Sequence, residues 1–402
     1  MYQEVKRAER VCGTLGKEKL KFTKKTPPAK NSSCTIHIYK TLSIIGIIYR
    51  GVKMAGIDKI KLKNVYSALT KNKLDGLILS DVNDMKYLLG DFFCEGEACI
   101  LIHKKGVLAV SRPLYENDAK KAYPEMKFIP LEQNKHFEII KQAKNLKLKA
   151  VAFDEEKEYY AQAKEYKKAG FKTVSNFINL VRATKTEQEI KIMKEAAQIA
   201  YGALLYIKKE IKAGVTEKQI ALKIEMFMRE RGATAMSFIP LVSFGANAAN
   251  PHHFPDDTKL TKNTAVLLDF GCVYKGYCSD ITRCFWFGDK IDPEYQKILD
   301  LAILAHDTAA KKAKYGMTGA QIDALARSII EKAGYGKYFI HRTGHGIGMQ
   351  DHELADISAL NKNKIGSNYC FSIEPGIYLP GKFGVRYEDC FYMTKKGIKQ
   401  IK

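Results

Sequence analysis

Short apolar runs alternate with lysine-rich amphipathic stretches between Met54 and about Phe177. Runs of four or five apolar residues bounded by Gly or polar turn residues are typical of strands. Two of these runs flank Lys104-Lys105-Gly106, which predicts a β-hairpin at that point. The predicted strands are 76–79, 98–102, 107–110, 127–129 and 150–153. Strands that alternate with helical stretches indicate a small α/β domain over residues 54–180.

Beyond Val181 the pattern changes to longer helices separated by pairs of strands. Three of the predicted helices begin with Thr followed three residues later by Glu or Gln, the capping-box pattern. A fourth begins at Asp292-Pro293, an N-cap residue followed by a proline at the first helical position. The capping pairs are Thr186 with Glu189, Thr216 with Gln219, and Thr318 with Gln321. We expect these three helices to end near residues 211, 232 and 334.

Two of these helix starts resemble each other. Thr216-x-x-Gln219-Ile220 and Thr318-x-x-Gln321-Ile322 lie 102 residues apart, and each helix is followed by strand-like sequence. Self-similarity at a fixed interval predicts two similar halves within residues 181–402. A site formed between such halves would draw its residues from widely separated positions.

Residues 1–53 differ from the rest of the chain. They hold 12 Lys and Arg against three acidic residues, out of a formal net charge of +22 for all 402 residues, and show no sustained period. We expect a disordered basic extension or a start codon assigned too early, with the fold beginning at Met54. A basic surface suits nucleic acid, anionic membrane or acidic peptides. Because no basic stripe with interleaved aromatic residues appears, a solvated lysine-rich surface is the favoured interpretation.

The cysteines and the apolar runs indicate where the protein resides. Nine cysteines, an odd number without a CxxC pair, favour a reducing compartment over a disulfide framework or a zinc knuckle. The apolar run 42–49 is far shorter than the about 20 residues of a membrane span. It also lies too deep in the chain for a secretory signal. We therefore expect a cytoplasmic protein without a membrane partner.

Candidate chemistry gathers in the second half of the chain. Asp269 interrupts the apolar run 265–270, and Asp280 lies inside the run 276–287. If Tyr274 and Lys275 form a two-residue hairpin loop, Asp269 lies directly opposite Asp280 on the same face of the sheet. Two buried carboxylates that face each other repel unless a cation lies between them. The pair therefore points to a hard divalent metal ion.

Three later segments add further candidate ligands. His345 lies in the glycine-rich string HRTGHGIG, Glu374 in FSIEPG, and Glu388 in GVRYED, where Arg386 precedes it on the same face. Carboxylates with one imidazole suit manganese or cobalt at least as well as zinc or iron. Each residue taken singly is more commonly structural. Their combination in one order is what favours a metal site.

The five residues Asp269, Asp280, His345, Glu374 and Glu388 resemble, in order and local context, the ligands of the M24 metallopeptidase family, which contains prolidase, aminopeptidase P and methionine aminopeptidase. The strings GHGIG, SIEPGIY and VRxED carry this resemblance over residues 181–402. Residues 54–177 more weakly resemble the N-terminal domain of the prolidase and aminopeptidase P branch. The resemblance implies an α/β N-terminal domain followed by an α+β pita-bread (creatinase/aminopeptidase-like) catalytic domain with two pseudo-symmetric halves.

The resemblance also implies a metallo-exopeptidase that holds two divalent metal ions, with manganese expected first and cobalt, zinc or iron as alternatives. In the family pattern Asp269 would hold one ion, Asp280 and Glu388 would bridge both ions, and His345 with Glu374 would complete the second. A pair of ions of this kind activates a water and polarises the scissile carbonyl. Glu374 would also transfer a proton from the water to the leaving nitrogen.

Three more residues match family positions. The resemblance implies that His252 contacts the substrate near its leaving side and that His352 steadies the oxyanion of the tetrahedral intermediate. Arg386 matches an arginine found in Xaa-Pro peptidases and absent from methionine aminopeptidases. His253 is expected to be a neighbour without a role. The HExxH motif is not the basis for a site, because Asp356 stands where its second histidine would be.

The expected activity is hydrolysis of the N-terminal Xaa-Pro bond of a peptide whose second residue is proline. Whether the protein is an Xaa-Pro dipeptidase or an Xaa-Pro aminopeptidase is left open. One alternative is a methionine aminopeptidase-like exopeptidase, against which the added domain and Arg386 argue. The other is a catalytically silent pita-bread module that binds nucleic acid or protein through its basic surface, against which the intact ligand set argues. Relatives are often dimers, so a homodimer stays open.

Overall fold

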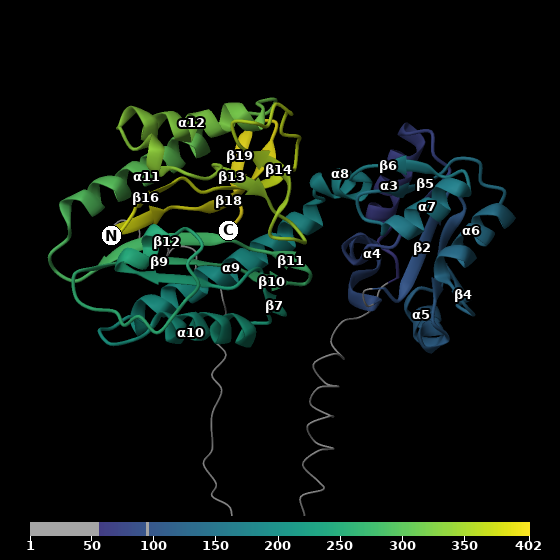
Figure 1. Ribbon diagram of the computed structural model, residues 1–402, viewed down its shortest axis with the longest axis horizontal. Helices are drawn as coiled ribbons and strands as arrows, with labels where there is room; N and C mark the ends of the chain where they lie inside the picture. The colour runs from purple at the N-terminus through teal and green to yellow at the C-terminus, as the bar shows by residue number, and fades with distance from the viewer. Residues whose placement is uncertain (1–55, 94–95) are drawn as a thin grey trace, which may run out of the picture. The chain divides into compact units, whose positions relative to one another are not determined.

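The computed structural model describes residues 56–93 and 96–402. The predicted basic extension at 1–53 and the predicted start at Met54 lie outside these residues. The described chain forms an N-terminal domain that ends with α8 (Phe177–Ala183) and a C-terminal domain that begins with α9 (Glu187–Glu210) (Figure 1). Among the described residues, no helix has the length and apolar character needed to cross a membrane.

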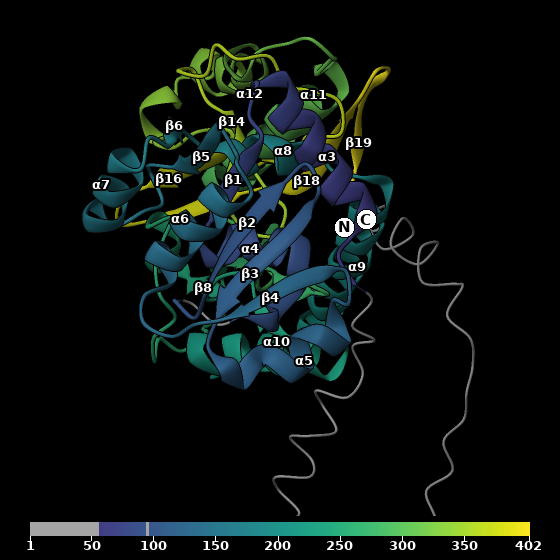
Figure 2. The same ribbon diagram turned by 90° about the vertical axis from the view of Figure 1, so that its right-hand side faces the viewer.

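A six-stranded mixed sheet forms the centre of the N-terminal domain, in the order β4-β3-β2-β1-β5-β6. Figure 2 shows β2, β3 and β4 side by side within it. The hairpin predicted around Lys104-Lys105-Gly106 is confirmed, since β2 and β3 pair from Ala98 with Ser111 to His103 with Gly106. The strands are β1 (Gly76–Leu79), β2 (Ala98–His103), β3 (Gly106–Ser111), β4 (Met126–Pro130), β5 (Val151–Asp154) and β6 (Lys172–Val174).

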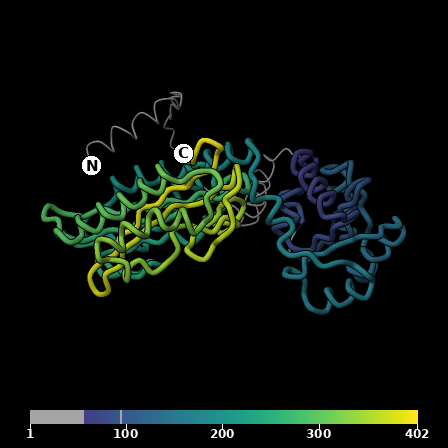
Figure 3. Tube along the Cα trace, turned by 90° about the horizontal axis from the view of Figure 1, so that it is seen from above, coloured from purple at the N-terminus to yellow at the C-terminus, as the bar shows by residue number. Residues whose placement is uncertain are grey.

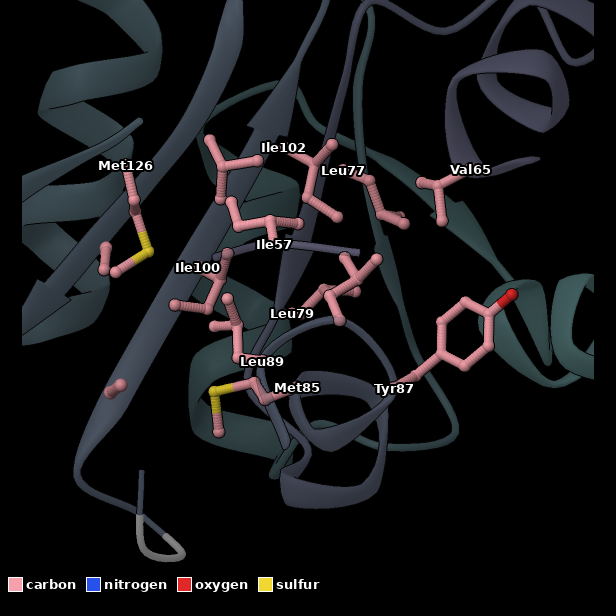
Figure 4. Close-up of a cluster of buried hydrophobic side chains, with 14 of the residues drawn as sticks. Ile57, Val65, Leu77, Leu79, Met85, Tyr87, Leu89, Ile100, Ile102 and Met126 are labelled. Atoms are coloured by element: carbon pink, nitrogen blue, oxygen red, sulfur yellow. The ribbon is translucent and has the colours of Figure 1, made fainter. Parts of the chain in front are cut away.

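Helices cover both faces of this sheet, which is why strands such as β1 are buried at every position. Leu77 and Leu79 point into one core together with Ile100 and Ile102 (Figure 4), while Ile78 belongs to a second core on the opposite face. Alternation of side chains along a strand produces this division. The first core is closed by α3 (Lys59–Lys71), α4 (Val82–Leu89), α5 (Glu116–Ala122) and α8, and the second by α6 (Lys135–Asn145) and α7 (Tyr160–Lys168).

Four long helices frame the C-terminal domain: α9, α10 (Glu217–Glu230), α11 (Pro293–Lys312) and α12 (Gly319–Lys332). Each of the three predicted capping boxes is present, with the Thr side chain and the Glu or Gln side chain three residues later both bonded to backbone N–H groups. Asp292 caps α11 by accepting hydrogen bonds from the Glu294 and Tyr295 backbone N–H groups, with Pro293 at the first helical position. These local signals set the helix starts that the sequence predicts.

The C-terminal domain consists of two halves, each with a pair of helices packed on strands. In the first half α9 and α10 share a core with β8, β9 and β12, and in the second α11 and α12 share a core with β15 to β18. Figure 1 shows the two helix pairs on opposite sides of the strands. The strands are β7 (Ala235–Met236), β8 (Leu241–Phe244), β9 (Thr264–Phe270), β10 (Cys272–Tyr274), β11 (Tyr277–Cys278), β12 (Ile281–Phe287), β13 (Gly344–Gly346), β14 (Glu353–Ile357), β15 (Cys370–Ile373), β16 (Gly376–Leu379), β17 (Phe383–Arg386), β18 (Asp389–Thr394) and β19 (Gly397–Gln400).

The predicted repeat is confirmed. Helices α10 and α12 are both 14 residues long and start 102 residues apart. Thr216 and Thr318, the two N-caps, each form a lone antiparallel bridge, with Lys259 and Lys364 respectively. Figure 3 shows that segments from the middle of the chain and from its C-terminal end run side by side in this domain. Residues distant in sequence can therefore meet between the halves.

Candidate metal centre

The hairpin that carries the two aspartates has a different register from the predicted one. The turn is formed by Lys275 and Gly276, whose φ angles are 48° and 79°, so that Tyr274 pairs with Tyr277. Positive φ at both central residues is the requirement of the tight hairpin turn that matches strand twist, and glycine meets it most easily. The register therefore shifts by two residues, and Thr282 rather than Asp280 lies directly opposite Asp269.

A shift of two residues preserves the face of each side chain. Asp280 lies in the break between β11 and β12, opposite Gly271, where an added Cβ would come within 1.7 Å of the Ser279 carbonyl oxygen. This close approach explains why glycine occupies position 271. Asp269 still raises the cost of ionising Asp280, since it contributes to the raised pKa of Asp280. The prediction of opposed partners was wrong, and the prediction of neighbouring buried carboxylates is confirmed.

The second half of the domain brings three more predicted residues to this hairpin. Possible ligand atoms of Asp280, His345 and Glu388 all lie within 4.8 Å of one another. Glu374 follows β15, and one of its carboxylate oxygens lies 3.4 Å from His345 Nε2. Glu388 precedes β18 and forms a lone antiparallel bridge with Thr282, which ties the two halves together at the site.

His345 is oriented for its Nε2 atom to serve as a ligand. Its Nδ1–H donates a hydrogen bond to the Gly346 carbonyl at 3.0 Å, which leaves Nε2 facing Asp280 and Glu374 at 3.5 and 3.4 Å. A backbone carbonyl that fixes one ring nitrogen is the usual way in which a metal-binding imidazole is held. The Ser372 hydroxyl accepts from the His345 backbone N–H and donates to Glu374, so one serine positions two of the predicted ligands.

Three carboxylate oxygens in this cluster show that the donor set suits cations. Among the described residues, Asp269 Oδ1, Asp280 Oδ1 and Glu388 Oε1 are buried without a hydrogen-bond partner. Burial, reinforced by the neighbouring carboxylates, holds the pKa of Asp280 and of Glu388 well above the usual range. Buried charges of one sign are stable only when opposite charge joins them. Oxygen-rich ligation with one imidazole fits divalent metal ions.

The five residues Asp269, Asp280, His345, Glu374 and Glu388 are called the metal-type cluster below. Arg386 lies at the end of β17 and connects this cluster to its surroundings. It is 3% exposed and forms an ion pair with Asp269. Its Nε donates to the Thr282 hydroxyl at 3.1 Å, and that hydroxyl donates in turn to Glu388 at 2.6 Å. One guanidinium therefore fixes two of the predicted ligands from the side away from their unpartnered oxygens.

Two further residues join the site that the sequence argument did not assign. His341 donates from Nδ1 to the Arg342 carbonyl at 2.7 Å and accepts at Nε2 from the Tyr378 hydroxyl at 2.8 Å. Tyr378 accepts from Arg386 Nη1 at 2.7 Å. Burial lowers the pKa of His341 below its usual value. The signal available in the sequence was a second histidine in the same glycine-rich string, four residues before His345.

The two predicted substrate histidines occupy different places. The ring of His352 lies 4.1 Å from that of His345, and burial together with the His345 ring lowers its pKa. His352 therefore borders the metal-type cluster. His252 is exposed and lies next to Pro251, whose carbonyl oxygen is 3.5 Å from Arg386 Nη1. His253, expected to have no role, donates from Nε2 to the buried Glu217 at 2.8 Å.

A carboxylate-rich cluster that fits divalent cations therefore lies between two similar helix-and-strand halves. The model of the Metallopeptidase family M24 matches residues 191–395, and that of the Creatinase/Prolidase N-terminal domain matches residues 61–184. The chain belongs to metallopeptidase family M24, with a creatinase-type N-terminal domain and a pita-bread catalytic domain.

Individual relatives of known sequence or structure are also peptidases by name. An uncharacterized peptidase of Staphylococcus epidermidis is 42% identical over 229 residues, which are 57% of this chain and 65% of that relative. An Xaa-Pro dipeptidase from Bacillus anthracis is 34% identical with a TM-score of 0.79, over 85% of this chain and 96% of that one. An X-Pro aminopeptidase from Thermotoga maritima is 31% identical with a TM-score of 0.76, over 83% and 97%.

Proposed function

We propose that the protein is a dinuclear-metal exopeptidase that hydrolyses the N-terminal Xaa-Pro bond of peptides. The observation that carries this proposal is the group of three buried, unpartnered carboxylate oxygens beside His345, whose Nε2 atom faces Asp280 and Glu374. Arg386 supports the Xaa-Pro branch, as do the printed activities of the structural relatives from B. anthracis and T. maritima. Dipeptidase and aminopeptidase activity both occur among these relatives.

Five residues would hold two divalent ions: Asp269, Asp280, His345, Glu374 and Glu388. Manganese is the ion we would test first, before cobalt, zinc and iron. The chemistry that such a pair supplies is a nucleophilic hydroxide at neutral pH and polarisation of the scissile carbonyl. Arg386, Thr282 and Ser372 keep the carboxylates turned toward the cluster, so little reorganisation is needed when the substrate arrives.

The remaining roles belong to side chains around the cluster. The Glu374 carboxylate would take a proton from the attacking water and deliver it to the proline nitrogen, whose departure requires protonation. His352, beside His345, would donate a hydrogen bond to the oxyanion, a contact commonly worth about 3 kcal/mol in the transition state. His252 is exposed and follows Pro251, whose carbonyl contacts Arg386, and it would bind the leaving side of the substrate.

The deciding experiment compares hydrolysis of Ala-Pro, Ala-Pro-Ala and Met-Ala-Ser by metal-free protein reloaded with manganese. Glu374→Ala is the inactive control, and Glu187→Gln, an exposed acidic residue in the first turn of α9, is the matched surface control. We expect cleavage of a proline substrate by the native protein and by Glu187→Gln, and none by Glu374→Ala. Preference for the dipeptide or the tripeptide then distinguishes a dipeptidase from an aminopeptidase.

Two results would contradict the proposal. Release of methionine from Met-Ala-Ser without cleavage of either proline peptide would assign the protein to the methionine aminopeptidase type. Absence of cleavage with every metal, together with salt-sensitive binding to RNA, would support a binding module that uses its basic surface.

A further inference from the structure

The first residue of α10, Glu217, is a carboxylate with no exposed surface that lies outside the metal-type cluster. Oε1 accepts hydrogen bonds from the Phe244 backbone N–H at 2.7 Å and from the Asn247 amide at 3.0 Å. Oε2 accepts from His253 Nε2 at 2.8 Å and from the Asp256 backbone N–H at 3.1 Å. Four donors from residues 244–256 therefore converge on one side chain.

The group formed by Glu217, His253 and Asp256 has the composition of a cation site, since its possible ligand atoms lie within 4.8 Å of one another. The hydrogen bonds argue for a different role. Both oxygens of Glu217 already accept two hydrogen bonds each, so no lone pair is left facing an ion. In the metal-type cluster, by contrast, three oxygens have no donor. Glu217 is thus the acceptor that holds a segment of chain together.

That segment is also attached to α10 by its backbone. The Glu217 N–H donates to the Thr258 carbonyl at 3.2 Å, and the Lys218 N–H donates to the Asp256 carbonyl at 3.2 Å. Asn247 joins the two arms of the segment, because its amide donates both to Glu217 and to the Thr258 hydroxyl at 3.1 Å. Residues 244–258 are therefore attached near both ends to the start of α10, through side-chain and backbone hydrogen bonds.

The middle of the segment reaches the site. An added Cβ at Gly384 would come within 2.0 Å of the Ala248 carbonyl, so β17 packs against the segment at backbone distance. Two residues later Arg386 Nη1 lies 3.5 Å from the Pro251 carbonyl. His252 stands between Pro251, which contacts Arg386, and His253, which contacts Glu217. The contacts of its two sequence neighbours therefore fix the backbone of His252, while its imidazole ring stays exposed.

We propose that Glu217 is a positioning residue that fixes His252 at the substrate. Its hydrogen bond with His253, the next residue in the chain, connects Glu217 to His252. The inference rests on the proposed function, because it takes His252 as the residue that meets the leaving side of the substrate. A carboxylate is required, since four N–H donors need two acceptor oxygens with two lone pairs each. A carboxamide offers only one oxygen and presents N–H groups to two of the donors.

The kinetic experiment uses a double-mutant cycle on Ala-Pro hydrolysis by the manganese-loaded protein. Glu217→Gln and His252→Ala should each lower kcat/KM by about 10- to 100-fold, the usual cost of misplacing a group at a reacting centre. If Glu217 acts through His252, the double variant should be no worse than His252→Ala alone. Glu187→Gln, at the same position of α9 and exposed, should match the native protein.

His253 provides a rescue test within the same assay. His253→Leu removes the donor and should reproduce the Glu217→Gln defect, whereas His253→Gln keeps an N–H donor and should recover most of the activity. A merely destabilising change would not distinguish these two variants by their kcat/KM. Losses that multiply in the double-mutant cycle, or equal defects in His253→Leu and His253→Gln, would overturn the proposal.

Hydrogen exchange gives a second readout that needs no catalysis. In Glu217→Gln, the amides of residues 244–256 should exchange at least about tenfold faster than in the native protein, while those of β9 stay unchanged. Unchanged protection of 244–256 would overturn the proposal. If the native protein cleaves no Xaa-Pro peptide, the proposed function fails, and the exchange result alone decides whether Glu217 fixes the segment that carries His252.

Discussion

The two halves of the catalytic domain share a scaffold but anchor their site segments differently. Both have a 14-residue helix with a threonine capping box, preceded by a glycine at φ 88°, namely Gly214 and Gly316. In the first half the buried acid stands at the first helical position, as Glu217. The equivalent position in the second half is Gly319, where a Cβ would come within 2.2 Å of the Asp356 carbonyl.

The second half places its buried acid one turn later. Asp323 accepts from the Thr343 N–H and hydroxyl at 3.2 and 2.7 Å, and thereby holds the chain two residues before His345. It also forms an ion pair with Arg327 at 2.7 Å. The scaffold therefore repeats in backbone geometry, whereas each half positions its site loop with a different side chain.

The largest effect is expected where the halves meet, at Arg386. In chelator-treated protein, Arg386→Ala should lower the free energy of unfolding by about 3–5 kcal/mol, because it leaves Asp269 buried and unpaired. Arg386→Lys should recover only part of this, since an ammonium cannot contact Asp269, Thr282 and Tyr378 together. Urea unfolding measures both. A native-like midpoint for Arg386→Ala would show that the halves do not depend on this contact.

A second buried contact, between β14 and the residues just before α9, is expected to depend on pH. The Glu353 side chain is 3% exposed and pairs with Lys185 at 2.7 Å and Arg182 at 3.1 Å. Burial opposes its ionisation, but the two cations outweigh burial and hold the pKa of Glu353 below its usual value. A lowered folded-state pKa stabilises the protein above the unfolded value of about 4.3, and this stabilisation is lost as the pH falls through the folded value.

Glu353→Gln should therefore cost about 3 kcal/mol at pH 7, because both cations lose their counterion. The difference from the native protein should shrink steadily below about pH 4. Urea unfolding across pH 3–8 tests this. A difference that stays constant with pH would mean that the loss comes from packing rather than from charge.

The anchors of the two halves provide a matched pair. Asp323→Asn should lower the free energy of unfolding by about 2 kcal/mol, because Arg327 and Thr343 lose a charged acceptor. It should also weaken manganese binding, since Thr343 precedes His345 by two residues. Glu217→Gln should leave manganese affinity unchanged, as its segment carries no predicted ligand. Isothermal titration with manganese separates the two. Equal manganese affinities in the two variants would show that Asp323 and Glu217 do not differ in their effect on the metal site.

The smallest effect concerns the shared scaffold. Thr216→Ala and Thr318→Ala should each cost about 1 kcal/mol, because each removes the acceptor for the backbone N–H at the third helical position. The two losses should agree within about 0.5 kcal/mol, and serine at either position should restore stability. Thermal unfolding checks both. Clearly unequal losses would show that the repeat does not extend to the energetics of the caps.

The sequence predicted local features well because their causes are local. The helix starts follow from Thr186, Thr216 and Thr318 with their partners three residues later. The predicted hairpin register was wrong because it centred the turn on Tyr274 and Lys275, while the turn requires positive φ at Lys275 and Gly276, and glycine adopts it most easily. The five candidate ligands were found through a resemblance between short strings, and the structure brings them together.

Other parts of the site depend on contacts that no local pattern encodes. The links from Arg386 to Asp269 and Thr282 span 117 and 104 residues. The contact between His341 and Tyr378 spans 37. His253 gave no signal in the sequence, because its partner Glu217 lies 36 residues away and looks like an ordinary acid in the first turn of a helix. Burial, rather than residue type, distinguishes Glu217 from the exposed Glu187.

The repeat of α10 and α12 also bears on symmetry. Two separate copies of one half, related by a two-fold axis, would present every side chain at their interface in duplicate. A centre built that way would need ligands in identical pairs. With both halves in one chain, the proposed ligands differ between them: the first half would supply two aspartates and the second a histidine and two glutamates. Covalent linkage thus permits an asymmetric centre, in which the two faces of a substrate can meet different groups.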